Sequence, residues 1–94
     1  MCVSLLDEAR KEIDLIDAQM AKLFEQRMAA AKKVAEYKKE TGMPIFDATR
    51  EAQILASAVN RVQNDAICSY YRNFLQAVMD ISKAYQSSLI HDND

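Results

Sequence analysis

Two cationic side chains on one predicted helix, Arg27 and Lys38, have the spacing to bind a small anion. Arg27 interrupts a row of apolar residues that recurs every three or four positions from Leu6 to Tyr37, the pattern of a helix face turned toward a core. Arginine keeps its charge and is costly to bury without a partner. Lys38 follows three helical turns later on nearly the same face, about 16 Å away. The pattern predicts an anion pocket, an internal ion pair, or an arginine that reaches past its neighbours to water.

The composition argues against several other kinds of chemistry. The 94 residues carry a net charge of −2, whereas nucleic-acid binding needs a dominant basic face. His91 is the only histidine, so we expect neither a histidine-activated nucleophile nor a metal site. Cys2 and Cys68 lack metal or redox spacing and are expected to be reduced thiols. With no apolar run of membrane-spanning length and no pattern of a secretory signal, we expect a cytoplasmic protein without membrane partners.

The distribution of glycine and proline predicts the fold class. The one Gly and the one Pro both lie between residues 41 and 44, and no segment alternates as a strand would. We therefore predict an all-α fold in a single domain over residues 1–94. Its three predicted helices cover residues 5–39, 48–63 and 65–90. Gly42 is expected to end the first helix in a left-handed conformation, and Asp47 and Asn64 are expected at the starts of the others.

The first predicted helix is too long for a compact monomer. About 35 residues extend roughly 50 Å, whereas a domain of this size is about 30 Å across. A second copy is therefore expected to cover the exposed apolar row. Antiparallel pairing about Met20 to Leu23 would bring the partner's Arg10 between Arg27 and Lys38. The sequence thus predicts an intertwined antiparallel homodimer with two composite anion sites.

The order and spacing of these residues resemble the all-helical chorismate mutases over nearly the whole chain. The matching motifs are Arg10 within residues 6–14, Arg27 within 24–28, Lys38 at the end of 34–38, residues 44–51, and residues 80–82 with Gln86. Each motif is weak alone, but their joint order on three helices is specific. The resemblance implies an isomerase that rearranges chorismate to prephenate on the shikimate route to phenylalanine and tyrosine. It also implies a homodimer with two sites and no cofactor or metal.

The resemblance implies a role for each matching residue. Arg27 and the partner's Arg10 would grip the two carboxylates of chorismate. Lys38 and Gln86 would donate hydrogen bonds to the ether oxygen, which gains negative charge in the transition state. The other substrate-binding positions would be Glu51 with the backbone N–H of Asp47, at the ring hydroxyl, and Ser82 with Arg50, near a carboxylate.

Other interpretations of these residues remain open. Glu51 and Arg50 could be ordinary charges at a helix start, and Ser82 and Gln86 could be polar residues at the edge of an apolar face. We interpret the other cations as solvated surface charges: Lys11, Lys22, Lys32, Lys33, Lys39, Arg61, Arg72 and Lys83. Three other functions remain possible: an isochorismate-pyruvate lyase of the same fold, a non-catalytic helical dimerisation module, and a regulatory module of a larger enzyme. The Arg50-Glu51 pair favours the mutase over the lyase.

Overall fold

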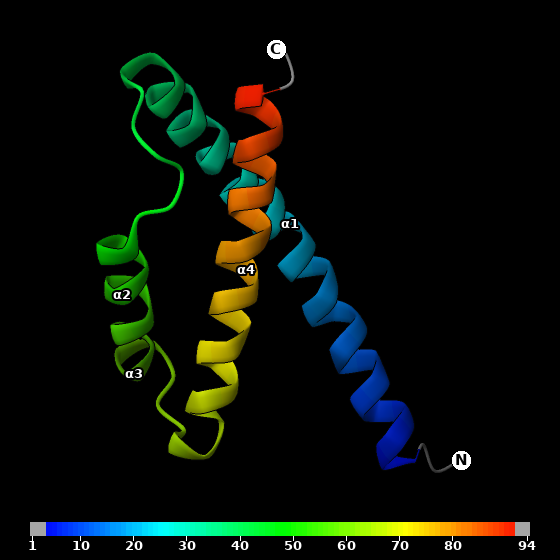
Figure 1. Cartoon of the computed structure of the whole chain (residues 1–94). Coiled ribbons are helices and arrows are strands. Elements are labelled where there is room, and N and C mark those ends of the chain that lie inside the picture. The colour runs from blue at the N-terminus through cyan, green and yellow to red at the C-terminus, as the bar shows by residue number, and fades with distance from the viewer. Residues whose placement is uncertain (1–3, 92–94) are drawn as a thin grey trace. The chain divides into compact units, whose positions relative to one another are not determined.

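The computed structural model describes residues 4–91, and all regular secondary structure in this range is helical (Figure 1). The helices are α1 (Leu5–Thr41), α2 (Ala48–Ala56), α3 (Ala58–Arg61) and α4 (Asp65–His91). The predicted all-α class and the long first helix are confirmed. The chain divides into two compact units, Met1–Ala30 and Ala31–Asp94, and α1 contributes to both.

Local sequence determines where α1 begins and ends. The Asp7 N–H donates to the Ser4 hydroxyl at 3.1 Å, which caps the first turn. At the other end Gly42 has a φ of 74°, and its N–H donates to the Lys38 carbonyl at 2.8 Å. A residue with a Cβ would be strained at this φ, whereas glycine adopts it readily. The predicted left-handed cap at Gly42 is confirmed.

The starts of α2 and α4 also follow from single residues. Asp47 has extended backbone angles, and its carboxylate accepts a hydrogen bond from the Arg50 N–H at 3.0 Å. The Asn64 side chain accepts from the Ala66 N–H at 3.0 Å, just before α4 begins. Both are side-chain caps that satisfy backbone donors left open at a helix start. The predicted positions of Asp47 and Asn64 at the helix starts are confirmed.

The helical segment predicted over residues 48–63 is interrupted at Ser57. Its hydroxyl donates to the Ile54 carbonyl at 2.6 Å, and its N–H is shared between the Gln53 carbonyl at 3.1 Å and the Ile54 carbonyl at 3.2 Å. Such local bonding by serine competes with the regular helical pattern. The segment is therefore two consecutive helices, α2 and α3, and the second ends at Arg61 rather than at residue 63.

In the second unit, α2 and α3 pack against α4 (Figure 1). The buried apolar side chains of the described chain all belong to this unit: Ala31, Ala35, Ala58, Leu75 and Met79. Ala31 and Ala35 are one turn apart and so share a face of α1. Three of the five are alanines, so the chain by itself buries a small apolar core.

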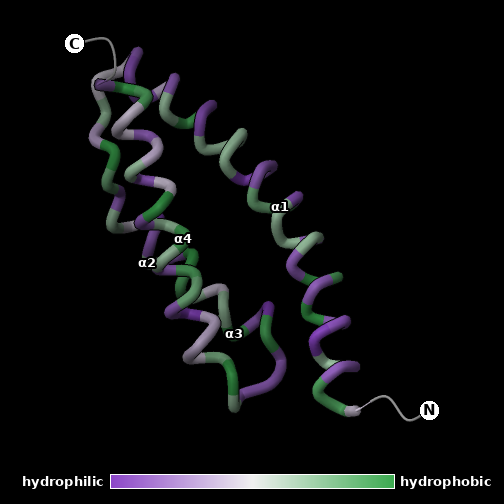
Figure 2. The backbone as a smooth tube through the Cα atoms, turned by 90° about the vertical axis from the view of Figure 1, so that its right-hand side faces the viewer, coloured by the Kyte–Doolittle hydropathy of each residue, from purple (hydrophilic) through white to green (hydrophobic). Residues whose placement is uncertain are grey.

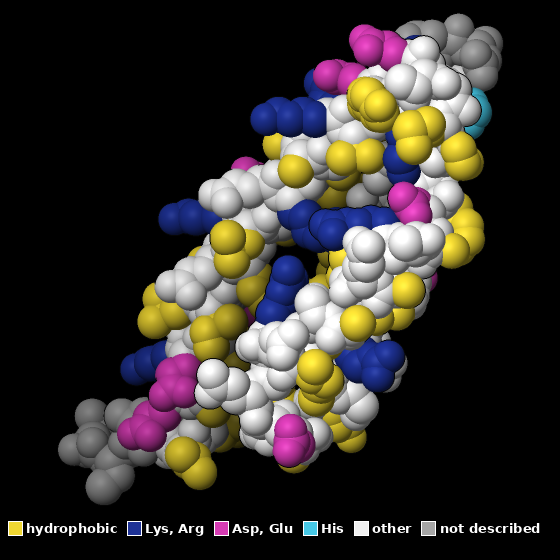
Figure 3. Space-filling model, turned by 90° about the vertical axis from the view of Figure 1, so that its left-hand side faces the viewer, with side chains coloured by type: hydrophobic (Ala, Val, Ile, Leu, Met, Phe, Trp, Pro, Cys, Tyr) yellow, Lys and Arg dark blue, Asp and Glu magenta, His cyan; other side chains and the backbone are white. Residues whose placement is uncertain are grey.

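In the first unit, α1 leaves its apolar side chains exposed. Among those in the predicted row, Leu6 is 57% exposed, Ile13 52% and Leu23 61%. Figure 2 shows apolar and polar residues alternating along this helix, and Figure 3 shows hydrophobic side chains scattered among polar and charged ones on the displayed face. Within residues 4–91, none of the helices combines the length and the apolar character needed to cross a lipid bilayer.

Candidate functional site

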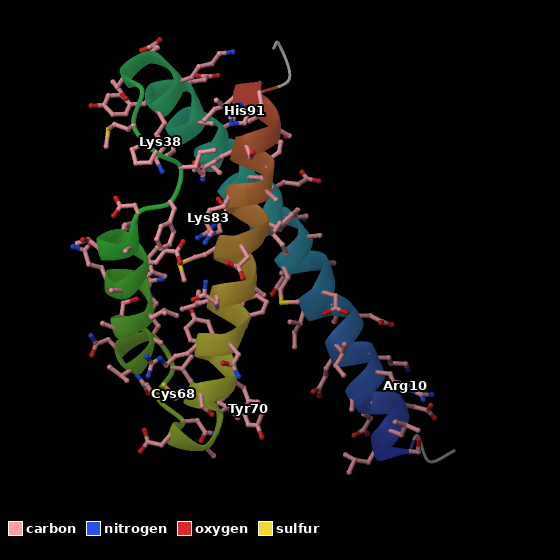
Figure 4. The ribbon with its side chains drawn as sticks, in the orientation of Figure 1. Arg10, Lys38, Cys68, Tyr70, Lys83 and His91 are labelled. Atoms are coloured by element: carbon pink, nitrogen blue, oxygen red, sulfur yellow. The ribbon has the colours of Figure 1, made fainter. Side chains whose placement is uncertain are left out.

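Lys38 holds the loop between α1 and α2. Its ammonium donates to the Ile45 carbonyl at 2.6 Å, and the residue is half-buried near the end of α1 (Figure 4). An ammonium has three donors, so this bond leaves two of them for other acceptors. Lys38 therefore links the loop to α1 and keeps donor capacity for a bound ligand.

Ser82 and Gln86 are the buried polar side chains of α4, each 7% exposed. Gln86 Nε2 donates to Ser82 Oγ at 3.1 Å. Gln86 Oε1 is buried and has no hydrogen-bond partner in the described part of the chain. The interpretation of both residues as edge residues of an apolar face is therefore wrong, because the packing of the second unit encloses them.

The open hydrogen-bonding capacity of Gln86 indicates a ligand site. Leaving a buried amide oxygen without a partner costs about 1–3 kcal/mol, and such groups in native structures usually meet a ligand or water. A half-turn of the amide lets Oε1 accept from the Ser82 hydroxyl and leaves Nε2 to donate elsewhere. In either orientation, one end of a buried amide is held by Ser82 and the other is available.

Glu51 of α2 is joined to α4 through Lys83. The Lys83 ammonium lies 2.9 Å from Glu51 Oε2 and 3.3 Å from Asp80 Oδ1. Gln76 Nε2 donates to Asp80 Oδ1 at 3.0 Å and to Glu51 Oε1 at 3.4 Å. The same ammonium lies 4.8 Å from the centre of the Phe46 ring, in cation–π range. The interpretation of Lys83 as a solvated surface charge is therefore wrong.

These contacts shift two pKa values in opposite directions. The hydrogen bond to Glu51 has the largest effect on Lys83 and, with the one to Asp80, raises the pKa of Lys83 above its ordinary value. The hydrogen bonds from Gln76 and then from Lys83 lower the pKa of the Asp80 carboxyl. Both groups are charged at neutral pH, so the ion pair is present there.

We expect Asp80→Asn to lower the melting temperature at pH 7 and to lower it less at pH 3, which is below the ordinary carboxyl pKa. The pKa of Asp80 is lowered in the folded chain, so its contribution to stability is present above the ordinary carboxyl pKa and is lost as pH falls through the folded value. Thermal melts of both proteins at several pH values measure the difference. Glu40→Gln, which removes an exposed carboxylate outside this cluster, is the control. An equal difference at pH 7 and pH 3 would contradict the assignment.

The three predicted site arginines lie on α1 and α2. Arg10 is exposed and Arg27 is half-buried, and both belong to the first unit. Within the described part of that unit, no ion pair holds either guanidinium, which removes an internal partner on α1 as the explanation for Arg27. Arg50 is exposed on the first turn of α2, next to the half-buried Glu51.

The sequence analysis missed Lys83 and Gln76. Gln76, Asp80 and Lys83 are spaced by four and three residues, so they share a face of α4. That spacing was the available signal, since it places an amide, an acid and a base in one polar row. The row is part of the site because Gln76 and Lys83 contact Glu51, which is 25 residues from Gln76 in the chain.

The chain has two cysteines, Cys2 and Cys68. Cys68 is half-buried and forms no disulfide, and Cys2 lies outside the described residues. Among residues 4–91, no cluster of three or more His, Cys, Asp or Glu side chains is arranged to hold a metal ion.

Comparison with known proteins gives one family match and several relatives. The family model for chorismate mutase type II matches residues 9–87. A chorismate mutase of Methanocaldococcus jannaschii is 46% identical over 52 residues, 55% of this chain and 52% of that protein. A bifunctional chorismate mutase/prephenate dehydratase of Aquifex aeolicus is 29% identical over 86 residues, 83% of this chain and 24% of that protein.

A 3-dehydroquinate dehydratase of Pyrobaculum aerophilum is also similar, at 27% identity over 81 residues, 86% of this chain and 24% of that protein. No solved structure matches the chain. The alignments thus span between about a quarter and a half of these relatives' own lengths. The family match runs from residue 9 to residue 87 and includes every predicted site residue from Arg10 to Gln86. The chain therefore belongs to the type II chorismate mutase family.

Proposed function

We propose that this chain is a chorismate mutase, an isomerase that converts chorismate to prephenate in aromatic amino acid biosynthesis. The observation that carries the proposal is the buried Gln86 amide, held at one end by Ser82 and without a partner at the other, in a chain of this family. The name of the Methanocaldococcus relative supports the same activity.

The reaction is an intramolecular rearrangement in which the ether C–O bond breaks while a C–C bond forms. No proton or group is transferred to the protein, so the side chains act by binding and by electrostatics. Lys38 and Gln86 would donate hydrogen bonds to the ether oxygen as it gains negative charge. Donors placed in advance at such an oxygen stabilise the transition state more than the ground state.

The other predicted residues would hold the substrate in its reactive conformation. Arg27 and the partner's Arg10 would bind the two carboxylates, and Arg50 and Ser82 would lie near one of them. Glu51, together with the backbone N–H of Asp47, would bind the ring hydroxyl. Confining the flexible enolpyruvyl arm over the ring removes conformational freedom that the free substrate must lose before it reacts.

We also propose that residues 1–94 form a single domain that works as an intertwined antiparallel homodimer. The exposed apolar row on α1 and the small, alanine-rich core support this assembly, since a second copy would bury both chains' apolar surface. A two-fold axis near Met20 to Leu23 would place the partner's Arg10 between Arg27 and Lys38. The free Cys68 thiol is compatible with a reducing cytoplasm, the proposed location.

The test is incubation of the purified chain with chorismate, followed by its absorbance and by identification of the product. We expect prephenate. Release of pyruvate from isochorismate, with chorismate left unchanged, would instead identify the lyase of the same fold. A folded protein that changes neither substrate would contradict both activities and favour a non-catalytic module.

We expect Gln86→Glu to make activity depend on acid. Glutamine donates its N–H at any pH, whereas a glutamate donates to the ether oxygen only when protonated, and its reference pKa is about 4.3. Turnover of the variant should therefore fall as pH rises from 5 to 8, while the wild type should show no such fall. Gln63→Glu, at an exposed position between α3 and α4, is the control for added charge. A flat pH–rate profile for Gln86→Glu would remove Gln86 from the ether contact.

A further inference from the structure

The side chains that surround Glu51 assign a role to Lys83 that the family resemblance did not include. We propose that Lys83, assisted by Gln76, is a positioning residue that orients the Glu51 carboxylate toward the ring hydroxyl of the substrate, so that the enzyme selects the isomer whose hydroxyl reaches it. This inference rests on the proposed function. It concerns the contact between α2 and α4, which lies entirely in the second unit.

Glu51 is held at both carboxylate oxygens. Lys83 contacts Oε2 at 2.9 Å and Gln76 contacts Oε1 at the longer distance of 3.4 Å. The Glu51 side chain is 16% exposed and that of Lys83 is 28% exposed, so the pair is partly shielded from solvent. A carboxylate accepts about four hydrogen bonds. Two contacts fix its plane and leave lone pairs for a ligand hydroxyl.

The Lys83 ammonium is itself held from both sides. Asp80, one turn earlier on α4, contacts it at 3.3 Å, and the ring of Phe46 lies on it from the loop before α2. Figure 4 shows the Lys83 side chain between α4 and α2. With Glu51, Asp80 and the ring as neighbours, the ammonium has little capacity to follow a substrate carboxylate.

The charge of the cluster argues for the same role. One lysine and two carboxylates, Glu51 and Asp80, sum to a charge of −1 at neutral pH, so the cluster repels a dianion and does not form another carboxylate site. It suits a neutral donor instead. A hydroxyl donates to a fixed carboxylate only from one direction, and a site built to bind a hydroxyl discriminates strongly against ligands that cannot reach it.

The test is a double-mutant cycle between Lys83→Met and Glu51→Gln. Methionine keeps an unbranched stem near Phe46 but removes the charge. Because the hydroxyl contact is present in both the ground state and the transition state, we expect Lys83→Met to raise KM about tenfold with kcat nearly unchanged. In the Glu51→Gln background, Lys83→Met should change KM less than twofold. Lys83→Arg, which keeps the charge, should have a KM close to that of the wild type.

Controls separate this role from a general effect on folding or charge. Lys33→Met removes an exposed cation from α1 and should leave KM unchanged. Gln76→Leu removes the donor to the other Glu51 oxygen, together with the hydrogen bond to Asp80, but leaves the Lys83–Glu51 ion pair in place. It therefore provides a second test if Lys83→Met does not fold. We expect it to raise KM about threefold, and only when Glu51 is present. Circular dichroism verifies that each variant is folded.

Two kinds of result would overturn the positioning role. One is an unchanged KM in Lys83→Met. The other is a full tenfold rise in KM when Lys83→Met is added to Glu51→Gln, which would mean that Lys83 acts independently of Glu51. If the wild type leaves chorismate unchanged, the proposed function fails separately. The same four proteins are then compared by calorimetry with chorismate as the ligand, and absent binding or independent losses of affinity would overturn the positioning role as well.

Discussion

Replacement of Lys38 or Arg27 by alanine is expected to reduce kcat/KM by a factor of at least about 100 while the protein stays folded. Lys38 would stabilise charge that develops on the ether oxygen, and loss of one such donor typically reduces turnover by about 10²–10³. Arg27 would bind a substrate carboxylate through two parallel hydrogen bonds. Turnover with chorismate and thermal melts, measured on the same samples, should therefore diverge.

A second Lys38 variant is needed to separate loss of activity from loss of stability, because the ammonium also donates to the Ile45 carbonyl at 2.6 Å. Lys38→Arg retains a charge and donors for this carbonyl, so it should restore the melting temperature more fully than the activity. Lys39→Ala, at the exposed neighbouring position, is the matched control and should be close to the wild type. A Lys38 or Arg27 variant that unfolds yet keeps full activity per folded molecule would mean that the cation is structural.

Mixing inactive Arg10→Ala and Lys38→Ala chains is expected to recover about a quarter of wild-type activity. If each site takes Arg10 from one chain and Lys38 from the other, both homodimers lack function at every site. In a mixed dimer, one site carries both substitutions and the other carries neither. Random reassortment of equal amounts makes about half of the dimers mixed, each with one intact site of two.

The experiment is co-refolding of the two variants, followed by mass spectrometry to measure the mixed dimers and by chorismate turnover. Refolding each variant alone is the control and should give almost no activity. Mixing two Arg10→Ala preparations of different mass should also give no activity, although their chains exchange between dimers. Mixed dimers without activity would show that Arg10 does not complete the site of the other chain.

The helical class, the long first helix and the helix caps were predictable because they depend on residues close together in the chain. Gly42 ends α1 because its own φ is positive, and Asp47 begins α2 because its carboxylate accepts from an N–H three residues later. The one local feature missed was the break at Ser57, where a hydroxyl bonds to the carbonyl three residues before it. A serine within a helical segment is compatible with a continuous helix and with a break, so the sequence did not predict which of the two occurs.

Tertiary structure alone decided how the candidate site is held. The sequence indicated Lys38, Glu51, Ser82 and Gln86, but it did not indicate that Ser82 and Gln86 are buried or that Lys38 bonds to the loop. It also assigned Lys83 to the solvent. The physical reason is that exposure and ion pairing depend on which helices face each other, and Lys83 meets Glu51 only because α2 packs against α4.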